Sequence, residues 1–277
     1  MIDYLDFWKL TRPPFDAGPD PTFFFESLAH GEALARLMYF AADRTMGMAA
    51  LTGEIGAGKT LTLQVLASRL RPDLYRQIMV FTTTGSCDHV LAEINRQLKG
   101  GERSGHEPLD CAGLVLEFQR LVRERIVASG RHLLVVLDES QFMDESCLDT
   151  LKCLTNPISA GVSPVSLILA GQPELKARLR ALPQVYQRLG LIYHLGYLTR
   201  EEVAPYVRHR MAIAKAVREE VFDEKASNLL FEFSGGCPRQ INRICKLAVD
   251  RACLLQQTEI DVSMLRLIID DFEKQFA

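Results

Sequence analysis

The stretch "GEIGAGKT", Gly53 to Thr60, ends in a glycine, a lysine and a threonine. It follows a short apolar run at 46–52 and precedes a helical pattern at 60–70. A glycine loop between a strand and a helix is typical of phosphate binding, because backbone N–H groups and the helix dipole can surround phosphate oxygens. We expect Lys59 to add a positive charge and the Thr60 hydroxyl to bind Mg²⁺. The expected nucleotide-contacting residues are Gly53, Glu54, Ile55, Gly56, Ala57, Gly58, Lys59, Thr60 and Leu61.

Short apolar runs alternate with helical patterns on both sides of this loop. The runs lie at 46–52, 77–83, 132–140, 164–172 and 191–198, and the helical patterns at 30–42, 60–70, 86–98, 112–129, 144–155 and 173–189. Each run is apolar along nearly its whole length, as in strands that are buried on both faces. The alternation predicts an α/β fold with a parallel sheet that is covered by helices on both sides.

The patterns divide the chain into three parts. Residues 1–28 are rich in aromatic residues and proline, and we expect them to pack on the core of the domain that follows. That domain, 29–198, contains the strand and helix alternation. After it no comparable strand run occurs, and three signals indicate helix starts: "TREE" at 199–202, Asp223, and "CPRQINRI" at 237–244. Residues 199–277 are therefore predicted to form an all-helical domain.

Composition limits the class of protein. The 277 residues are 48% hydrophobic, with a net charge of −3 and a pI of about 6.1, so no global basic field attracts nucleic acid or anionic lipid. No stretch approaches the roughly 18 apolar residues of a membrane span, and two aspartates stand where a signal peptide has positive charge. Seven cysteines without a C-x-x-C pair indicate reduced thiols. We expect a cytoplasmic protein without a transmembrane segment.

Two carboxylates directly follow the apolar run "LLVVL" at 133–137. Such groups are costly to desolvate beside a core, which favours a functional interpretation. We expect Asp138 to hold Mg²⁺ through its water shell, and Glu139 to orient and polarise the attacking water. Together with the glycine loop they predict an ATPase, and the lack of an N-K-x-D signature disfavours a GTPase.

Further polar residues follow the later strands and helices. Gln172 ends the run at 164–172 and could reach the γ-phosphate or the water, although it could also be a simple turn residue. Arg188 lies at the end of a predicted helix, just before the last run, and could complete the site of a neighbouring subunit as an arginine finger, a role for which Arg178 and Arg180 compete. Arg239 lies in the first turn of a predicted helix, where a cation opposes the dipole unless an anion such as phosphate faces it.

These motifs in this order resemble the AAA+ ATPases, and more narrowly the ExeA/GspA-like branch. The N-terminal "FWKLTRPPF", "PDPTFFFES" and "EALARL", with "LAGQPEL" at 169–175 and "FEFSGGCPRQINRICKLAVDRA" at 231–252, resemble that branch over essentially the whole chain. The resemblance implies an αβα ATPase domain with a helical lid. It also implies that the residues act as Walker A (Lys59, Thr60), Walker B (Asp138, Glu139), sensor 1 (Gln172), sensor 2 (Arg239) and finger (Arg188).

The resemblance leaves three functions open, of which the third is a nucleotide-gated scaffold that hydrolyses ATP slowly and signals by its assembly state. The first is an ATPase that forms a homo-oligomeric ring or filament and drives assembly or remodelling of a secretion, pilus or polysaccharide-export system. The second is a TnsC-like regulator of transposition, which assembles on DNA in the presence of ATP. Basic clusters at 69–77, 120–125 and 208–218 could contact DNA, or could be the solvated faces of amphipathic helices.

Overall fold

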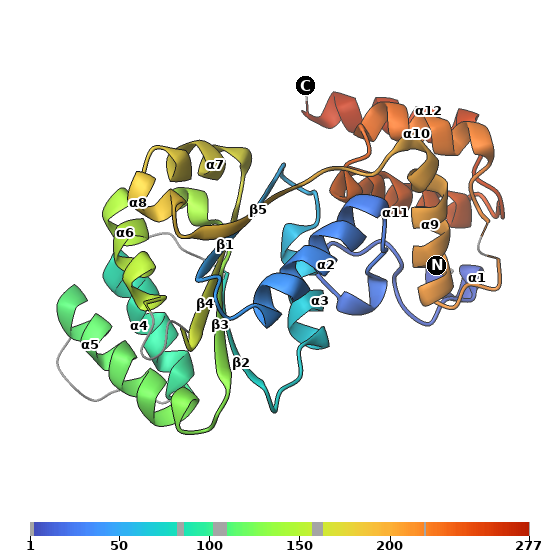
Figure 1. The fold of residues 1–277 in the computed structure, drawn as a ribbon. Coiled ribbons are helices and arrows are strands. Elements are labelled where there is room, and N and C mark those ends of the chain that lie inside the picture. Colours follow the sequence, from blue (N-terminus) through green and yellow to red (C-terminus); the bar gives the residue numbers. More distant parts are fainter. Residues whose placement is uncertain (1–2, 82–85, 102–109, 157–162, 219, 277) are drawn as a thin grey trace. The chain divides into compact units, whose positions relative to one another are not determined.

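The computed structural model describes residues 3–81, 86–101, 110–156, 163–218 and 220–276 (Figure 1). The chain forms two compact units. Unit 1 contains Met1–Gly31, Ile55–Leu61 and Gly196–Ala277, and unit 2 contains Glu32–Glu54 and Thr62–Leu195. The glycine loop is therefore divided, with its first two residues in unit 2 and the remainder in unit 1.

A five-stranded parallel sheet forms the centre of unit 2, which confirms the predicted α/β fold. Its strands lie in the order β2-β3-β4-β1-β5. Three of the five strands, β1, β3 and β4, are buried along their whole length, as their continuous apolar runs predict. The strands are β1 (Met48–Gly53), β2 (Tyr75–Val80), β3 (His132–Leu137), β4 (Val165–Gly171) and β5 (Leu189–Leu195).

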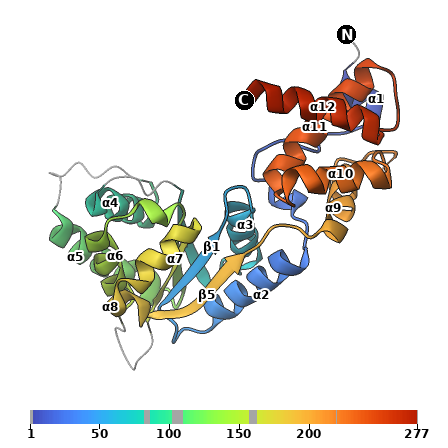
Figure 2. The same cartoon turned by 90° about the horizontal axis from the view of Figure 1, so that it is seen from above.

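Helices cover both faces of this sheet. Helices α4 to α8 lie on one face, and the parts of α2 and α3 that belong to unit 2 lie on the other (Figures 1 and 2). One apolar cluster fills the space between the sheet and helices α4 to α8, and in it Phe118 and Leu148 are almost fully buried. The elements are α2 (Leu28–Ala42), α3 (Lys59–Arg69), α4 (Cys87–Leu98), α5 (Cys111–Leu121) with the π-helical η2 (Val122–Val127), the short η3 (Ser140–Phe142), α6 (Glu145–Leu154), α7 (Pro173–Arg180) and α8 (Pro183–Tyr186).

The structure corrects the predicted pattern at three places, one of which is the strand expected over 191–198, which spans Leu189–Leu195. The helix expected over 173–189 is two helices, because Pro183 disfavours helical geometry at Leu182, whose φ of −113° and ψ of 84° interrupt it. The strand expected over 132–140 ends at Leu137, so the carboxylates lie on the turn that follows the strand. The end of the strand expected over 77–83 lies partly outside the described residues.

The C-terminal part of unit 1 is helical, as predicted. Helices α9 (Arg200–Ile213), α10 (Glu224–Ser234) and α11 (Pro238–Leu254) begin near the expected start signals, and the capping box between Thr199 and Glu202 is present. A further helix, α12 (Val262–Phe276), was not predicted. An isolated bridge between Phe222 and Ile260 joins the loops that precede α10 and α12.

The N-terminal segment packs with these helices. It contains the short helix α1 (Tyr4–Trp8) and the 3₁₀ turn η1 (Pro21–Phe23), and Trp8, Phe15 and Phe23 lie in the same apolar core as α9 to α12. The Trp8 indole N–H donates to the Val249 carbonyl at 3.0 Å. The aromatic composition correctly predicts burial, but the partner in the described contacts is the helical region of unit 1 rather than the expected α/β core.

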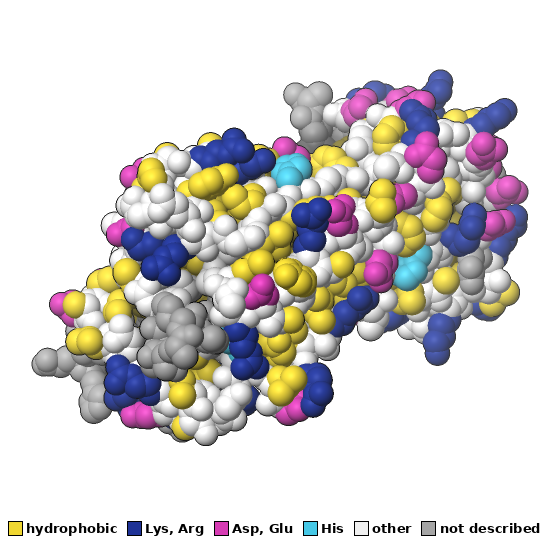
Figure 3. Space-filling view, viewed as in Figure 1, with side chains coloured by type: hydrophobic (Ala, Val, Ile, Leu, Met, Phe, Trp, Pro, Cys, Tyr) yellow, Lys and Arg dark blue, Asp and Glu magenta, His cyan; other side chains and the backbone are white. Residues whose placement is uncertain are grey.

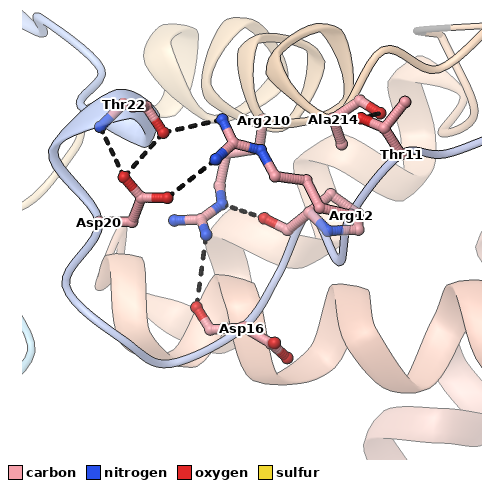
Figure 4. Close-up of polar contacts among 8 residues, drawn as sticks. Thr11, Arg12, Asp16, Asp20, Thr22, Arg210 and Ala214 are labelled. Carbon is pink, nitrogen blue, oxygen red and sulfur yellow. Dashed lines mark hydrogen bonds and ion pairs between the residues drawn. The ribbon is translucent and has the colours of Figure 1, made fainter.

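A buried arginine of α9 fastens this segment (Figure 4). Arg210 is only 5% exposed, and its guanidinium donates to the carbonyl oxygens of Pro14 and Asp16 and lies 4.5 Å from the centre of the Phe23 ring. Arg12 lies over the same ring at 4.4 Å and pairs with Asp20 at 3.0 Å. Because a buried guanidinium needs several acceptors, the two carbonyl groups explain how its charge is accommodated.

Candidate functional site

The glycine loop leads into helix α3 through two glycines with left-handed backbone. Gly56 and Gly58 have positive φ values of 82° and 97°, in a region that residues with a Cβ rarely adopt. Helix α3 begins at Lys59, directly after the loop, and this lysine is only 7% exposed. A cationic side chain at a helix N-terminus next to curled backbone fits an anionic ligand, and the adjacent Thr60 hydroxyl fits a metal bound to that ligand.

Side chains of unit 1 hold the carbonyl groups of the loop. The His30 Nε2–H donates to the Ala57 carbonyl at 2.8 Å, and the Tyr197 hydroxyl donates to the Ile55 carbonyl at 2.9 Å. Because a carbonyl can only accept, His30 carries its proton on Nε2, and Nδ1 accepts from the Ser27 hydroxyl at 2.7 Å. Neither His30 nor Tyr197 was predicted as a site residue from the sequence.

Arg239 lies beside the loop, on the first turn of α11. A Cβ placed on Gly56 would lie 2.8 Å from both the Arg239 Cβ and the Cys237 Sγ, so only glycine fits there. The Cys237 thiol also contacts the Ile55 carbonyl at 3.6 Å. The structure therefore brings Arg239 next to Gly56 within unit 1.

His30 is expected to make the stability of the protein depend on pH. Burial lowers the pKa of His30 below its ordinary value of 6.5, against the opposing effects of the Ala57 hydrogen bond and Glu202. Between the two pKa values, His30 is protonated in the unfolded chain and neutral in the folded protein. The contribution of neutral His30 to the free energy of unfolding is therefore complete above pH 6.5, and it is lost as the pH falls from there towards the lowered pKa.

The variant His30→Gln tests this expectation, because glutamine can still donate to Ala57 but does not titrate. Thermal midpoints measured at about pH 7.5 and about pH 5.5 should fall about 2–4 °C further in the wild type than in the variant. The lowered pKa values of His132 and His209 act in both proteins and cancel in the difference. An equal fall in both proteins would show that His30 does not titrate as proposed.

The acidic residues lie at one edge of the sheet in unit 2. The register pairs Thr52 with Gly171 and Leu137 with Leu169, so the carboxyl ends of β1, β3 and β4 meet at the same edge. Asp138 follows β3 there and is only 3% exposed, and Gln172 follows β4. A buried carboxylate at such an edge fits a divalent cation, for which carboxylate oxygens and water are the usual ligands.

Glu139 sits on a constrained turn. Its φ of 54° and ψ of 31° are left-handed, which is uncommon for a residue other than glycine, asparagine or aspartate. Its N–H donates to the Asp138 carboxylate at 2.9 Å, and its own carboxylate accepts from the Gln141 amide at 2.6 Å. The turn thus directs Glu139 away from the path of β3, and Gln141 is a further residue that the sequence analysis did not identify.

The three candidate finger arginines differ in their surroundings. Arg178 donates to the carbonyl groups of Gln141 and Met143, so it is used within its own unit, and Arg180 is exposed. Arg188 is exposed, precedes β5 and donates to Asn156 at 3.2 Å. Leu189 pairs with Met48 at the start of β1, so Arg188 lies where the strands begin. Asp138 lies where they end, roughly 15–20 Å away along the strand direction.

Each of the three basic clusters contains at least one arginine that pairs with an acidic residue. On the face shown in Figure 3, basic and acidic side chains are interspersed. Four arginines of the clusters form ion pairs, namely Arg71 with Asp73, Arg120 with Glu124, Arg208 with Glu220 and Arg218 with Glu259. This pairing favours solvated helix faces over a continuous basic surface.

Among the described residues, no helix is long and apolar enough to cross a membrane.

Comparisons with known proteins agree with these features. The family model described as "AAA domain" matches residues 42–179. General secretion pathway protein A of Aeromonas hydrophila is 36% identical over 252 residues, which are 89% of this chain and 44% of that protein, so the chain spans less than half the length of this relative.

The fold is similar to that of two solved archaeal structures. The Aeropyrum pernix ORC2 protein, in ADPNP and ADP complexes, has a TM-score of 0.71 at 21% identity, covering 94% of this chain and 71% of that one. Cdc6p from Pyrobaculum aerophilum has a TM-score of 0.69 at 19% identity, covering 83% and 63%. At these identities the likeness concerns the fold, a parallel sheet with flanking helices and a helical C-terminal region.

Proposed function

Because the chain belongs to the AAA+ ATPases, in the ExeA-like branch that includes general secretion pathway protein A, we propose that it hydrolyses ATP between subunits of a homo-oligomer. In this proposal hydrolysis drives the assembly or remodelling of a partner complex. The observation that carries it is the pair of carboxylates, one buried and one on a left-handed turn, which follow β3 at the carboxyl edge of the sheet. A structural role alone does not require two acidic groups at that position.

The proposed roles of the residues follow from their chemistry. Lys59, Arg239 and the N–H groups of the loop would bind phosphate oxygens, and the Thr60 hydroxyl and Asp138 would hold Mg²⁺. The metal ion would offset charge that develops on the phosphates. Glu139 would orient water and accept its proton, while Gln172 would contact the γ-phosphate or that water. Residues 29–198 would thus form the ATPase domain and 199–277 its lid.

Arg188 would act in the site of a neighbouring subunit. It lies at the edge of the sheet away from Asp138 and Gln172, so the same subunit cannot bring it to the γ-phosphate without rearranging the sheet. Of its competitors, Arg178 is held by two backbone carbonyl groups. An arginine supplied by a neighbour couples hydrolysis to oligomer formation, because each complete site needs two subunits.

Mixing two inactive variants tests this proposal. Arg188→Ala and Glu139→Gln should each lose ATP hydrolysis by about 10²-fold or more. Mixed oligomers contain interfaces in which an intact Glu139 meets an intact Arg188, so phosphate release should recover to a sizeable fraction of the wild-type rate. Arg180→Ala is the matched control and should remain active. Mixtures that stay inactive would show that Arg188 does not act between subunits.

The partner and process belong to the same proposal. The relation to general secretion pathway protein A supports an ATPase that serves a secretion system. We include pilus and polysaccharide-export systems and a cytoplasmic location in the same proposal. The alternative, a TnsC-like regulator that assembles on DNA, has less support because arginines of its three candidate basic clusters pair with acidic residues. Duplex DNA binding that strengthens with ATP and weakens with salt would favour this alternative.

A further inference from the structure

Gln141 uses both ends of its side-chain amide to join the turns that follow two neighbouring strands. Its Nε2 donates to Oε2 of Glu139 at 2.6 Å, on the turn after β3. Its Oε1 accepts from the backbone N–H of Gln172 at 3.1 Å, directly after β4. One side chain thus connects the proposed base to the residue proposed to contact the γ-phosphate.

The position of Gln141 is itself fixed by its backbone and by its surroundings. Arg178, on α7, donates through its two terminal nitrogens to the carbonyl oxygens of Gln141 and Met143, which span the end of η3. A planar guanidinium with two such acceptors holds a short turn in one orientation. Space for the amide exists because residue 171 is glycine: a Cβ there would lie 2.5 Å from Oε1 of Gln141.

Glu139 needs such a restraint more than a residue in a regular strand does. It lies on a left-handed turn and is only half-buried, and its side chain has three rotatable bonds. A hydrogen bond to one carboxylate oxygen fixes the plane of the group and hence the direction of the lone pairs on both oxygens. General base catalysis depends on that direction, because the base must lie within hydrogen-bond reach of the water it deprotonates.

We propose that Gln141 is a positioning residue for ATP hydrolysis, which orients the carboxylate of Glu139 and couples it to the backbone at Gln172. This inference rests on the proposed function, in which Glu139 is the base. It assigns Arg178 a supporting role, since Arg178 holds the turn that carries Gln141. Movement at the end of β4 would then be transmitted to Glu139 through a single amide.

The variant Gln141→Met removes both hydrogen bonds and keeps a side chain of similar length. We expect kcat for ATP to fall about 10-fold or more, while the Kd for ATP changes less than about 2-fold, because Gln141 orients the base and binds no phosphate. Gln257→Met, an exposed change of the same kind beyond α11, should leave both constants unchanged. A wild-type kcat in Gln141→Met would overturn the proposal.

The variant Gln141→Glu separates the two bonds. Its oxygen can still accept from the Gln172 N–H, but the ionised carboxylate cannot donate to Glu139. At about pH 8 the kcat of Gln141→Glu should therefore fall about 10-fold or more, as in Gln141→Met, although its hydrogen bond to the Gln172 N–H is kept. A wild-type kcat in Gln141→Glu would show that donation to Glu139 is not what matters.

The hydrogen bond between the Gln141 side chain and the Gln172 N–H can be tested without nucleotide and therefore independently of ATP hydrolysis. Hydrogen exchange of the Gln172 amide should be faster in Gln141→Met than in the wild type and protected in Gln141→Glu. Gly171→Ala, which displaces the Gln141 amide and leaves residue 141 unchanged, should resemble Gln141→Met in both kcat and exchange. Unchanged exchange in Gln141→Met would refute the link. A wild-type protein without ATPase activity would refute the proposed function instead, whatever the exchange result.

Discussion

Replacing Lys59 with methionine is expected to weaken ATP binding at least about 100-fold, which corresponds to about 2.8 kcal/mol. Lys59 is the first residue of α3, follows two glycines with positive φ, and is only 7% exposed. A charge held in such a place interacts with phosphate with little screening by solvent. Methionine is similar in length and also apolar along its stem, so the variant removes the charge and largely preserves the packing.

Calorimetric titration with ATP in the presence of Mg²⁺ measures this effect directly. Lys225→Met, an exposed lysine of α10, is the matched control and should bind ATP as the wild type does. Thermal midpoints of both variants should stay close to that of the wild type, which separates lost binding from lost folding. If Lys59→Met binds ATP with ordinary affinity, the glycine loop does not bind phosphate through this lysine.

The sheet could be predicted from the sequence because its physical signal is local. Strands buried on both faces need apolar residues at nearly every position, and the runs that became β1, β3 and β4 are recognisable without any knowledge of their neighbours. The common edge that holds Asp138 and Gln172 follows from the same signal, since parallel strands end at one side of the sheet. The residues that end these strands are therefore identified together with the fold.

The supporting contacts could not be predicted, because they depend on pairs far apart in the chain. His30 and Ala57 are 27 residues apart, and Gln141 and Gln172 are 31 apart. A single histidine in a helical pattern, or a glutamine after a pair of acids, has no distinctive spacing. Only the backbone geometry shows that His30 reaches the loop and that Gln141 meets the glycine at 171.

Two further features, the break before Pro183 and the burial of residues 1–28, could be predicted only in part from proline and aromatic residues. Pro183 lies inside the helix expected over 173–189, and the restriction it imposes on Leu182 explains the break between α7 and α8. The aromatic residues of 1–28 indicate burial, but burial does not specify a partner. The partner became clear from Arg210, whose guanidinium binds the carbonyl groups of this segment from within α9.

Replacing Glu139 with glutamine is expected to slow ATP hydrolysis by about 10²–10⁴-fold while ATP still binds. The amide has nearly the same shape as the carboxylate, and its oxygen can still accept the hydrogen bond from Gln141. It cannot take a proton from water, so the loss isolates proton transfer from positioning. Phosphate release under steady-state conditions, together with the Kd for ATP, measures the two quantities separately.

The same variant should prolong any oligomer that depends on bound ATP. If subunits associate through ATP and separate after hydrolysis, slower hydrolysis raises the population of the assembled state at a given ATP concentration. Sedimentation with ATP should then show larger species in Glu139→Gln than in the wild type, with a smaller difference when ADP replaces ATP. Glu145→Gln, the same change at an exposed position of α6, should behave as the wild type does. Unchanged turnover in Glu139→Gln would show that another residue is the general base, and that the turn after β3 does not have its proposed function.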